Sequence, residues 1–183
     1  MPLSKESIYT AEDYWNLPEG RRAELIDGKL YDMAPPSYIH QKMILKLSRT
    51  IDQYIETSHG HCEVLPAPFA VNLTGNDKNW VEPDISVICD KSKLSDRGCE
   101  GAPDWIIEIV SPSTQKNDYG LKLFKYRTAK VREYWIVNSE RKIVNVYDFE
   151  HDSNTGIYSF EDEIPVGIYP GFSIRVEDLI SSL

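Results

Sequence analysis

The run from Trp105 to Val110 constrains the fold of this chain more than any other feature. Five of its six residues are large and apolar, and Asp104 and Ser111 bound it. A short apolar run between polar ends is typical of a β-strand that is buried on both faces. The sequence therefore predicts a sheet whose two faces are covered by other elements.

Glu108 is the acidic residue within this run. Strand alternation places its side chain on the same face as Ile106 and Val110. Burying a carboxylate is costly unless a metal, a cation or hydrogen bonds compensate it. Taken alone, the strand allows two interpretations: Glu108 is a metal ligand, or it faces solvent at a sheet edge or pairs with a buried Arg or Lys.

The N-terminal third predicts a helix, a hairpin and a long helix. Thr10 is placed to cap a short helix over residues 11–17. The pair Asp27-Gly28 indicates a hairpin turn within residues 21–33. Apolar residues then recur at three- and four-residue steps, which predicts a helix from Ser37 to Gly60.

The remainder predicts strands that alternate with one further helix. Residues 62–73 are extended, but Pro66 and Pro68 disfavour a central strand there. Residues 90–101 indicate a surface loop, and Ser113 or Thr114 can cap a helix running to about Ala129. Further strands are expected at 84–89, 133–137 and 143–149, with edge strands at 158–160 and 172–176 and a short final helix. Residues 1–183 are thus expected to form a single α/β domain with a mixed central sheet flanked by helices.

Composition limits the function classes. The formal net charge is −9, which weighs against tight general binding to DNA. No apolar run approaches the roughly 20 residues that span a membrane, and the first twelve residues lack signal-peptide features, so a cytoplasmic location is expected. The odd cysteine count argues against a disulfide framework and a structural zinc site; the cysteines are Cys62, Cys89 and Cys99.

Asp84 opens the strand that precedes the Glu108 strand, directly after Pro83. An Asp at a strand start is also a common turn residue. Two strands joined by one loop can lie side by side, however, and bring Asp84 and Glu108 together. Two carboxylates plus water molecules suit Mg²⁺, or Mn²⁺ in its place.

Lys122 is the candidate basic residue on the helix after the Glu108 strand. Asp118, Lys122 and Tyr126 follow one another at four-residue steps and share a helix face. A lysine beside a metal can hold or help deprotonate the attacking water and offset phosphate charge. The plainer alternative is an exposed Asp118–Lys122 ion pair, and Lys116 and Lys125 compete for the role.

Three other features are open to more than one interpretation. Glu24, in the first hairpin, is either a further acidic ligand or a polar strand residue. His40 is more typical of a structural histidine than of a base. Aromatic residues such as Trp15, Tyr38 and Trp80 could instead form an oligomer surface.

The ordered set of motifs resembles the Uma-type restriction-endonuclease family, formerly classed as a domain of unknown function. The resemblance runs from about Tyr9 to Phe172 and includes the Glu24–Gly28 hairpin and His40. It also rests on four segments, which are Val81–Val87, Pro103–Thr114, Asp118 with Lys122 and Tyr126, and Glu133–Val137. It implies the PD-(D/E)xK nuclease fold, with Pro83-Asp84 as the first element and Glu108 as the second. The chain departs at Val110, where that pattern has Lys, and Lys122 on the next helix is the natural replacement.

The function expected from these features is a metal-dependent endonuclease that hydrolyses phosphodiester bonds, with DNA as its substrate. Asp84 and Glu108 would bind Mg²⁺ or Mn²⁺, Lys122 would act on water, and Glu24 would complete the acidic cluster. The alternative is a catalytically inactive module of the same fold that binds a protein or a nucleic acid. A homodimer is compatible with the endonuclease, because two sites would cut two strands.

Overall fold

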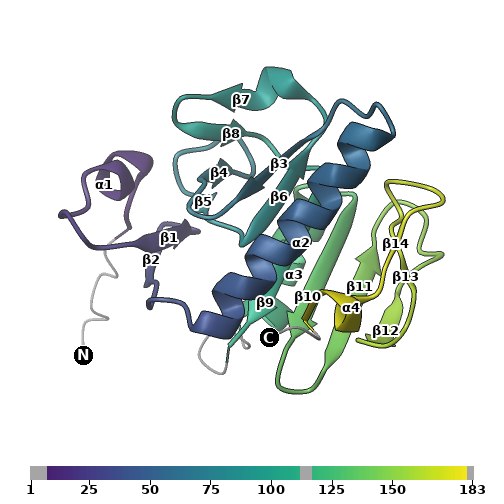
Figure 1. Ribbon diagram of the computed structural model, residues 1–183. Helices are drawn as coiled ribbons and strands as arrows, with labels where there is room; N and C mark the ends of the chain where they lie inside the picture. The colour runs from purple at the N-terminus through teal and green to yellow at the C-terminus, as the bar shows by residue number, and fades with distance from the viewer. Residues whose placement is uncertain (1–7, 112–116, 181–183) are drawn as a thin grey trace.

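A computed structural model describes residues 8–111 and 117–180 (Figure 1). Its centre is a six-stranded sheet in the order β12-β11-β10-β9-β6-β3. Strands β9 and β10 are parallel, and every other neighbouring pair is antiparallel. The strands are β3 (Glu63–Pro66), β6 (Ile85–Ile88), β9 (Trp105–Val110), β10 (Glu133–Asn138), β11 (Ile143–Asp148) and β12 (Gly156–Ser159).

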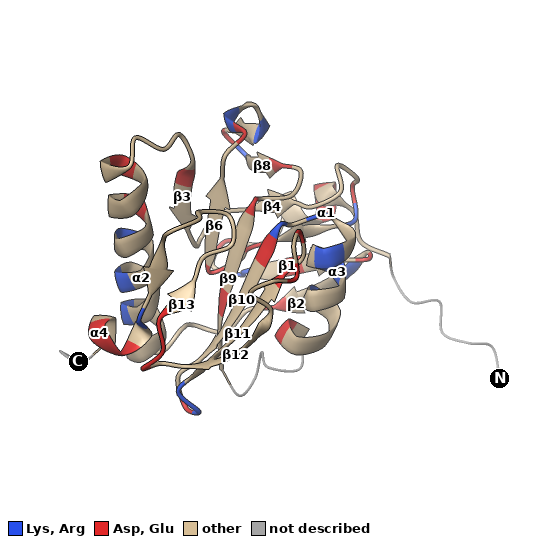
Figure 2. Ribbon diagram, turned by 90° about the vertical axis from the view of Figure 1, so that its right-hand side faces the viewer, with Lys and Arg blue, Asp and Glu red and all other residues tan. Residues whose placement is uncertain are grey.

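Helices cover both faces of this central sheet, as Figure 2 shows edge-on. The long helix α2 (Tyr38–Thr57) packs on one face, where Met43 and Leu47 join Ile107 in a shared core cluster. Its N-cap is Ser37, whose side chain accepts a hydrogen bond from the His40 backbone N–H. The short helices are α1 (Ala11–Trp15), α3 (Leu123–Thr128) and α4 (Val176–Ile180), of which α4 contacts α2 and α3 lies on the opposite face.

A second six-stranded sheet packs on the α3 side, in the order β2-β1-β5-β4-β8-β7. It begins with the predicted hairpin, whose turn residues Asp27 and Gly28 have φ values of 51° and 73°. A separate two-stranded ribbon pairs β13 (Ile164–Pro165) with β14 (Ser173–Ile174). The second sheet contains β1 (Ala23–Ile26), β2 (Lys29–Asp32), β4 (Val71–Asn72), β5 (Trp80–Val81), β7 (Leu94–Ser95) and β8 (Gly98–Glu100).

The mixed α/β architecture with a buried Glu108 strand is confirmed. Ile106 and Val110 lie in one core cluster, and Ile107 and Ile109 lie in the other. The strand is therefore covered on both faces, and Glu108 shares the face of Ile106 and Val110, which is the face toward α3. Strand β3, which ends at Pro66, is an edge strand, as this proline predicts.

The prediction that residues 90–101 form a loop is wrong. They contain a 3-10 turn at Lys91–Lys93 and the strands β7 and β8. β8 pairs in parallel with β4, and the backbone of Gly98 approaches Ala70 so closely that a Cβ would lie 2.1 Å from the Ala70 carbonyl oxygen. This segment has few apolar residues, so its pairing with a distant strand leaves little periodic signal in the sequence.

The expected helix up to Ala129 is formed only in part. The candidate caps Ser113 and Thr114 lie outside the described residues. Asn117–Lys122 form a π-helical turn, and the α-helix proper begins at Leu123. Single π-helical turns are often found at functional sites.

Two further expectations are overturned. Cys62 and Cys89 form a disulfide that joins β3 to β6, because the strand pairing places these residues side by side. Cys99 is free and buried. Trp80 is not an oligomer surface, since it is 4% exposed and stacks on Tyr14. Within the described ranges, no helix has the length and apolar character needed to cross a membrane.

Candidate active site

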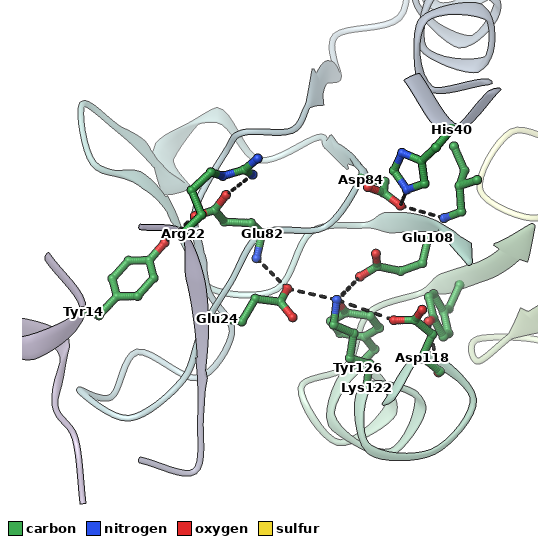
Figure 3. A network of polar contacts seen from close by, with 12 residues as sticks. Tyr14, Arg22, Glu24, His40, Glu82, Asp84, Glu108, Asp118, Lys122 and Tyr126 are labelled. Carbon is green, nitrogen blue, oxygen red and sulfur yellow. Dashed lines mark hydrogen bonds and ion pairs between the residues drawn. The ribbon is translucent and has the colours of Figure 1, made fainter. Parts of the chain in front are cut away.

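A pocket of about 490 Å³ lies where the first hairpin, the start of α2 and the ends of β6 and β9 meet. Asp84 and Glu108 both line it, together with Glu24, His40 and Lys122. In Figure 3, the carboxylates of Glu24 and Glu108 point toward the Lys122 ammonium, and His40 points toward Asp84. The pocket therefore collects every residue that the sequence assigns to the candidate site.

Asp84 and Glu108 come from neighbouring strands. The antiparallel register pairs Ile85 with Ile107. Because the two strands run in opposite directions, the residue before Ile85 lies opposite the residue after Ile107, and Asp84 therefore faces Glu108. The Ile109 backbone N–H donates a 2.7 Å hydrogen bond to Asp84 Oδ2. This bond fixes the Asp84 carboxylate at the point where the regular pairing of β6 with β9 ends.

The Lys122 ammonium lies among three carboxylates. Its Nζ atom is 2.9 Å from Glu24 Oε1, 2.9 Å from Glu108 Oε1 and 3.6 Å from Asp118 Oδ1. Lys122 is 6% exposed and Asp118 is 2% exposed, so the exposed surface ion pair considered for these two residues is not what forms. The π-helical turn carries both side chains into the pocket.

Tyr126 provides a second donor to Glu108. Its hydroxyl donates a 2.7 Å hydrogen bond to Glu108 Oε1, the same oxygen that Lys122 contacts. The Tyr126 ring is fully buried and packs edge-on against Tyr134. The π-helical turn and helix α3 therefore fix one oxygen of Glu108 through Lys122 and Tyr126, which the four-residue spacing predicts on one face.

His40 contacts Asp84 from the first turn of α2. His40 Nε2 lies 3.1 Å from Asp84 Oδ2. Burial opposes the charged imidazole, but the hydrogen bond and charge of Asp84 outweigh it and raise the pKa of His40 above its ordinary value. The histidine thus belongs to the site rather than only to the helix, which its sequence context alone did not indicate.

Glu24 links the site to the N-terminal hairpin. Its Oε1 atom accepts a 2.9 Å hydrogen bond from the Glu82 backbone N–H and contacts Lys122. The Glu82 side chain faces Tyr14 and Arg22 instead, whose hydroxyl and guanidinium donate to its two oxygens. Glu24 therefore belongs to the Lys122 cluster, whereas the Glu82 carboxylate is held at the pocket wall.

The surroundings of Lys122 favour its protonated form. Burial acts to lower the pKa of Lys122, but the charges of Glu108, Glu24 and Asp118 overcome it and raise the pKa well above its ordinary value. An ordinary lysine is already protonated at neutral pH, and the three carboxylates strengthen this preference. These surroundings favour the predicted role of offsetting phosphate charge over that of deprotonating water, and both roles stay predictions.

The structure shows which of the candidate lysines among the described residues lies in the pocket. Lys125 pairs with Asp27 on the hairpin turn and does not line the pocket. Lys116 lies outside the described residues. Lys122 is thus the lysine that the described part of the chain places in the site.

The donor set fits a hard divalent ion. No group of three or more His, Cys, Asp or Glu side chains within the described residues has the arrangement of a complete metal site. Mg²⁺ does not require one, because it binds through one or two carboxylates and keeps several waters. Asp84 and Glu108 supply two such carboxylates at a pocket that water can enter.

Comparison with known proteins places the chain in a family. Residues 11–177 match the family Uma2, whose description is "Putative restriction endonuclease". The chain belongs to the Uma2 family. This match confirms the resemblance drawn from the ordered motifs, and the Uma2 family is a family of nucleases by its description.

Two similar proteins support this placement. An uncharacterized protein from Synechocystis is 26% identical over 153 residues, which cover 82% of this chain and 79% of that protein. A crystal structure titled as a putative nuclease of DUF820 from Anabaena variabilis superimposes with a TM-score of 0.76 at 20% identity, and the match covers 94% of this Uma2 chain and 97% of that one. The similarity confirms the restriction-endonuclease-like fold.

Proposed function

We propose that this Uma2 protein is an endonuclease that uses Mg²⁺ or Mn²⁺ to hydrolyse phosphodiester bonds of DNA. The observation that carries the proposal is the excess of buried negative charge. Glu24, Glu108 and Asp118 surround one ammonium, and Asp84 lies on the neighbouring strand of the same pocket. Burial raises the pKa of Glu108, because its charged form is costly there without further compensation, so this cluster favours binding a further cation.

Asp84 and Glu108 would hold the ion. A bound divalent ion supplies a Lewis acid for the phosphoryl oxygen and lowers the pKa of a coordinated water. The contacts of Lys122 and Tyr126 with Glu108 Oε1 fix the orientation of this carboxylate. Asp84 is oriented in the same way by the Ile109 backbone and by His40.

Lys122 contributes as a permanent positive charge beside the reacting phosphate. Its ammonium reduces the repulsion between the carboxylates and an incoming phosphodiester, and it offsets charge that develops in the transition state. In this proposal Lys122 stays protonated, and the water proton passes to solvent. The chemistry then depends on electrostatic stabilisation rather than on a lysine base.

A second candidate function is a nuclease-fold module that binds a partner without cutting. The net charge of −9 and the Val110 that stands where the superfamily pattern has Lys favour it. So does the close contact of Lys122 with three carboxylates, which leaves little of its charge for a substrate. This module should neither cleave nucleic acid nor be stabilised by a divalent ion.

A nicking assay separates the two. Purified protein is incubated with supercoiled plasmid and with a labelled RNA, each with Mg²⁺, Mn²⁺ or EDTA. We expect the wild type to nick the plasmid with either ion. The variants Asp84→Ala and Glu108→Gln should lose this activity. Asp27→Asn is the matched control, because this exposed acid on the hairpin turn pairs with Lys125 outside the pocket. Activity that persists in Asp84→Ala would exclude the assigned site, and cleavage of RNA alone would exclude DNA as the substrate.

A further inference from the structure

The pocket presents few basic side chains to a polyanion. Among the described residues that line it, the lysines and arginines are Arg22 and Lys122. Lys122 is nearly buried and engaged by three carboxylates. Arg22 is therefore the basic side chain at the pocket wall that remains accessible, with 41% of its side chain exposed.

Arg22 is held in a fixed orientation by an acidic partner. Its Nη2 atom donates a 2.5 Å hydrogen bond to Glu82 Oε2, and Tyr14 donates its hydroxyl at 3.0 Å to Glu82 Oε1 (Figure 3). Burial, followed by the charge of Glu82, raises the pKa of the Tyr14 hydroxyl, so it remains a donor. Glu82 thus orients the guanidinium from one edge.

The rest of the guanidinium is available. An arginine carries five N–H donors in a planar fork. Apart from the bond to Glu82, the described part of the chain offers no hydrogen-bond partner to the Arg22 guanidinium. A phosphate oxygen pair matches the geometry of the free edge, because arginine binds phosphate through two parallel hydrogen bonds.

Arg21 provides an internal contrast. Its Nε atom donates to Asp32 Oδ1 at 2.8 Å, and its side chain is 46% exposed. Arg21 does not line the pocket. The two neighbouring arginines have the same charge and similar exposure but differ in their position relative to the site.

We propose that Arg22 binds a phosphate of the substrate strand adjacent to the phosphate that is cleaved. The proposal rests on the proposed nuclease function and assigns the contact that holds the strand at the pocket. Glu82 and Tyr14 are positioning residues that keep the guanidinium directed along the pocket wall. The Arg22 contact contributes to strand binding and not to the chemical step.

The test measures the affinity for a fluorescein-labelled 24-base-pair DNA duplex by anisotropy in Ca²⁺, across a series of NaCl concentrations. The binding constant falls as salt rises, and each lost phosphate contact makes the negative slope of log K against log[NaCl] less steep by about 0.9. Arg22→Gln should make the slope less steep by the value of about one contact and weaken binding about tenfold. Arg21→Gln should leave the slope and the affinity nearly unchanged. Arg22→Lys should keep most of the slope but lose affinity, because lysine lacks the fork.

Cleavage kinetics and folding give independent readouts. With Mn²⁺, Arg22→Gln should raise KM with little change in kcat, and its melting temperature is measured alongside. A purely structural role would lower the melting temperature and leave the salt slope unchanged, and this result would overturn the inference. Equal salt slopes in Arg22→Gln and Arg21→Gln would also overturn the inference about Arg22. The proposed nuclease function would survive that result if the wild type nicks the plasmid. A wild type that neither binds nor cuts DNA would overturn both proposals.

Discussion

Replacing Lys122 with Met tests the central electrostatic claim about this protein. Met fills a similar volume but removes the ammonium that contacts Glu24 and Glu108 at 2.9 Å and Asp118 at 3.6 Å. Removing one partner of a buried ion pair costs about 3–5 kcal/mol, since the remaining charge stays buried and uncompensated. For a chain of this size, that loss lowers the melting temperature by roughly 6–20 °C.

The assay is urea unfolding at pH 7, followed by thermal unfolding with and without Mn²⁺. Lys122→Met should be less stable than wild type, and Mn²⁺ should stabilise the variant more than the wild type, because the ion no longer competes with the ammonium. A tenfold gain in affinity for the ion corresponds to about 1.4 kcal/mol at saturating Mn²⁺. Nicking activity should nevertheless fall, because the fixed charge beside the phosphate is gone.

Two controls complete this experiment. Lys125→Met removes a lysine three residues after Lys122. Its partner Asp27 is largely exposed, so we expect the free energy of unfolding to change by only about 0–1 kcal/mol. The double variant Lys122→Met with Glu108→Gln should recover part of the lost stability, because one uncompensated carboxylate is removed. The reasoning is refuted if Lys122→Met unfolds at the same urea concentration as wild type.

Three further predictions concern other parts of the molecule. Tyr126→Phe keeps the buried ring but removes the donor to Glu108, so Mn²⁺ affinity measured by electron paramagnetic resonance should fall about 10–100-fold; unchanged affinity would show that the hydroxyl does not orient this carboxylate. Burial raises the folded-state pKa of Glu133, so the folded state holds this proton more tightly than the unfolded state, and stability should decline as pH rises from the ordinary carboxyl pKa through the raised value. Urea unfolding of wild type and Glu133→Gln across pH 4–7 checks this, and an equal slope in both would contradict it. Reduction of the Cys62–Cys89 disulfide, which closes a loop of sequence separation 27, should cost roughly 3 kcal/mol in urea unfolding with and without reductant, and coincident unfolding curves would argue against it.

Several elements of the fold follow from local sequence alone. The apolar run around Glu108 predicts a strand covered on both faces, and β9 is buried along its whole length. Asp27-Gly28 predicts the hairpin turn because few other residue pairs adopt positive φ at low cost. The periodicity of residues 39–55 predicts α2, and the spacing of Asp118, Lys122 and Tyr126 predicts their common face, on which all three are buried. Each of these features depends on neighbours within a few residues.

The tertiary structure decided which distant segments meet. Glu24 lies beside the Glu82 backbone across 58 residues of sequence, and Asp27 meets Lys125 across 98. The second sheet, the disulfide between β3 and β6, and the contact of His40 with Asp84 depend in the same way on strand register and helix packing. A local pattern reports whether a side chain is buried but not which side chain it faces. The sequence by itself placed Glu108 within an apolar strand and left open whether a metal, a basic side chain or solvent compensates its charge, and only the folded chain decided that Lys122 and Tyr126 contact it.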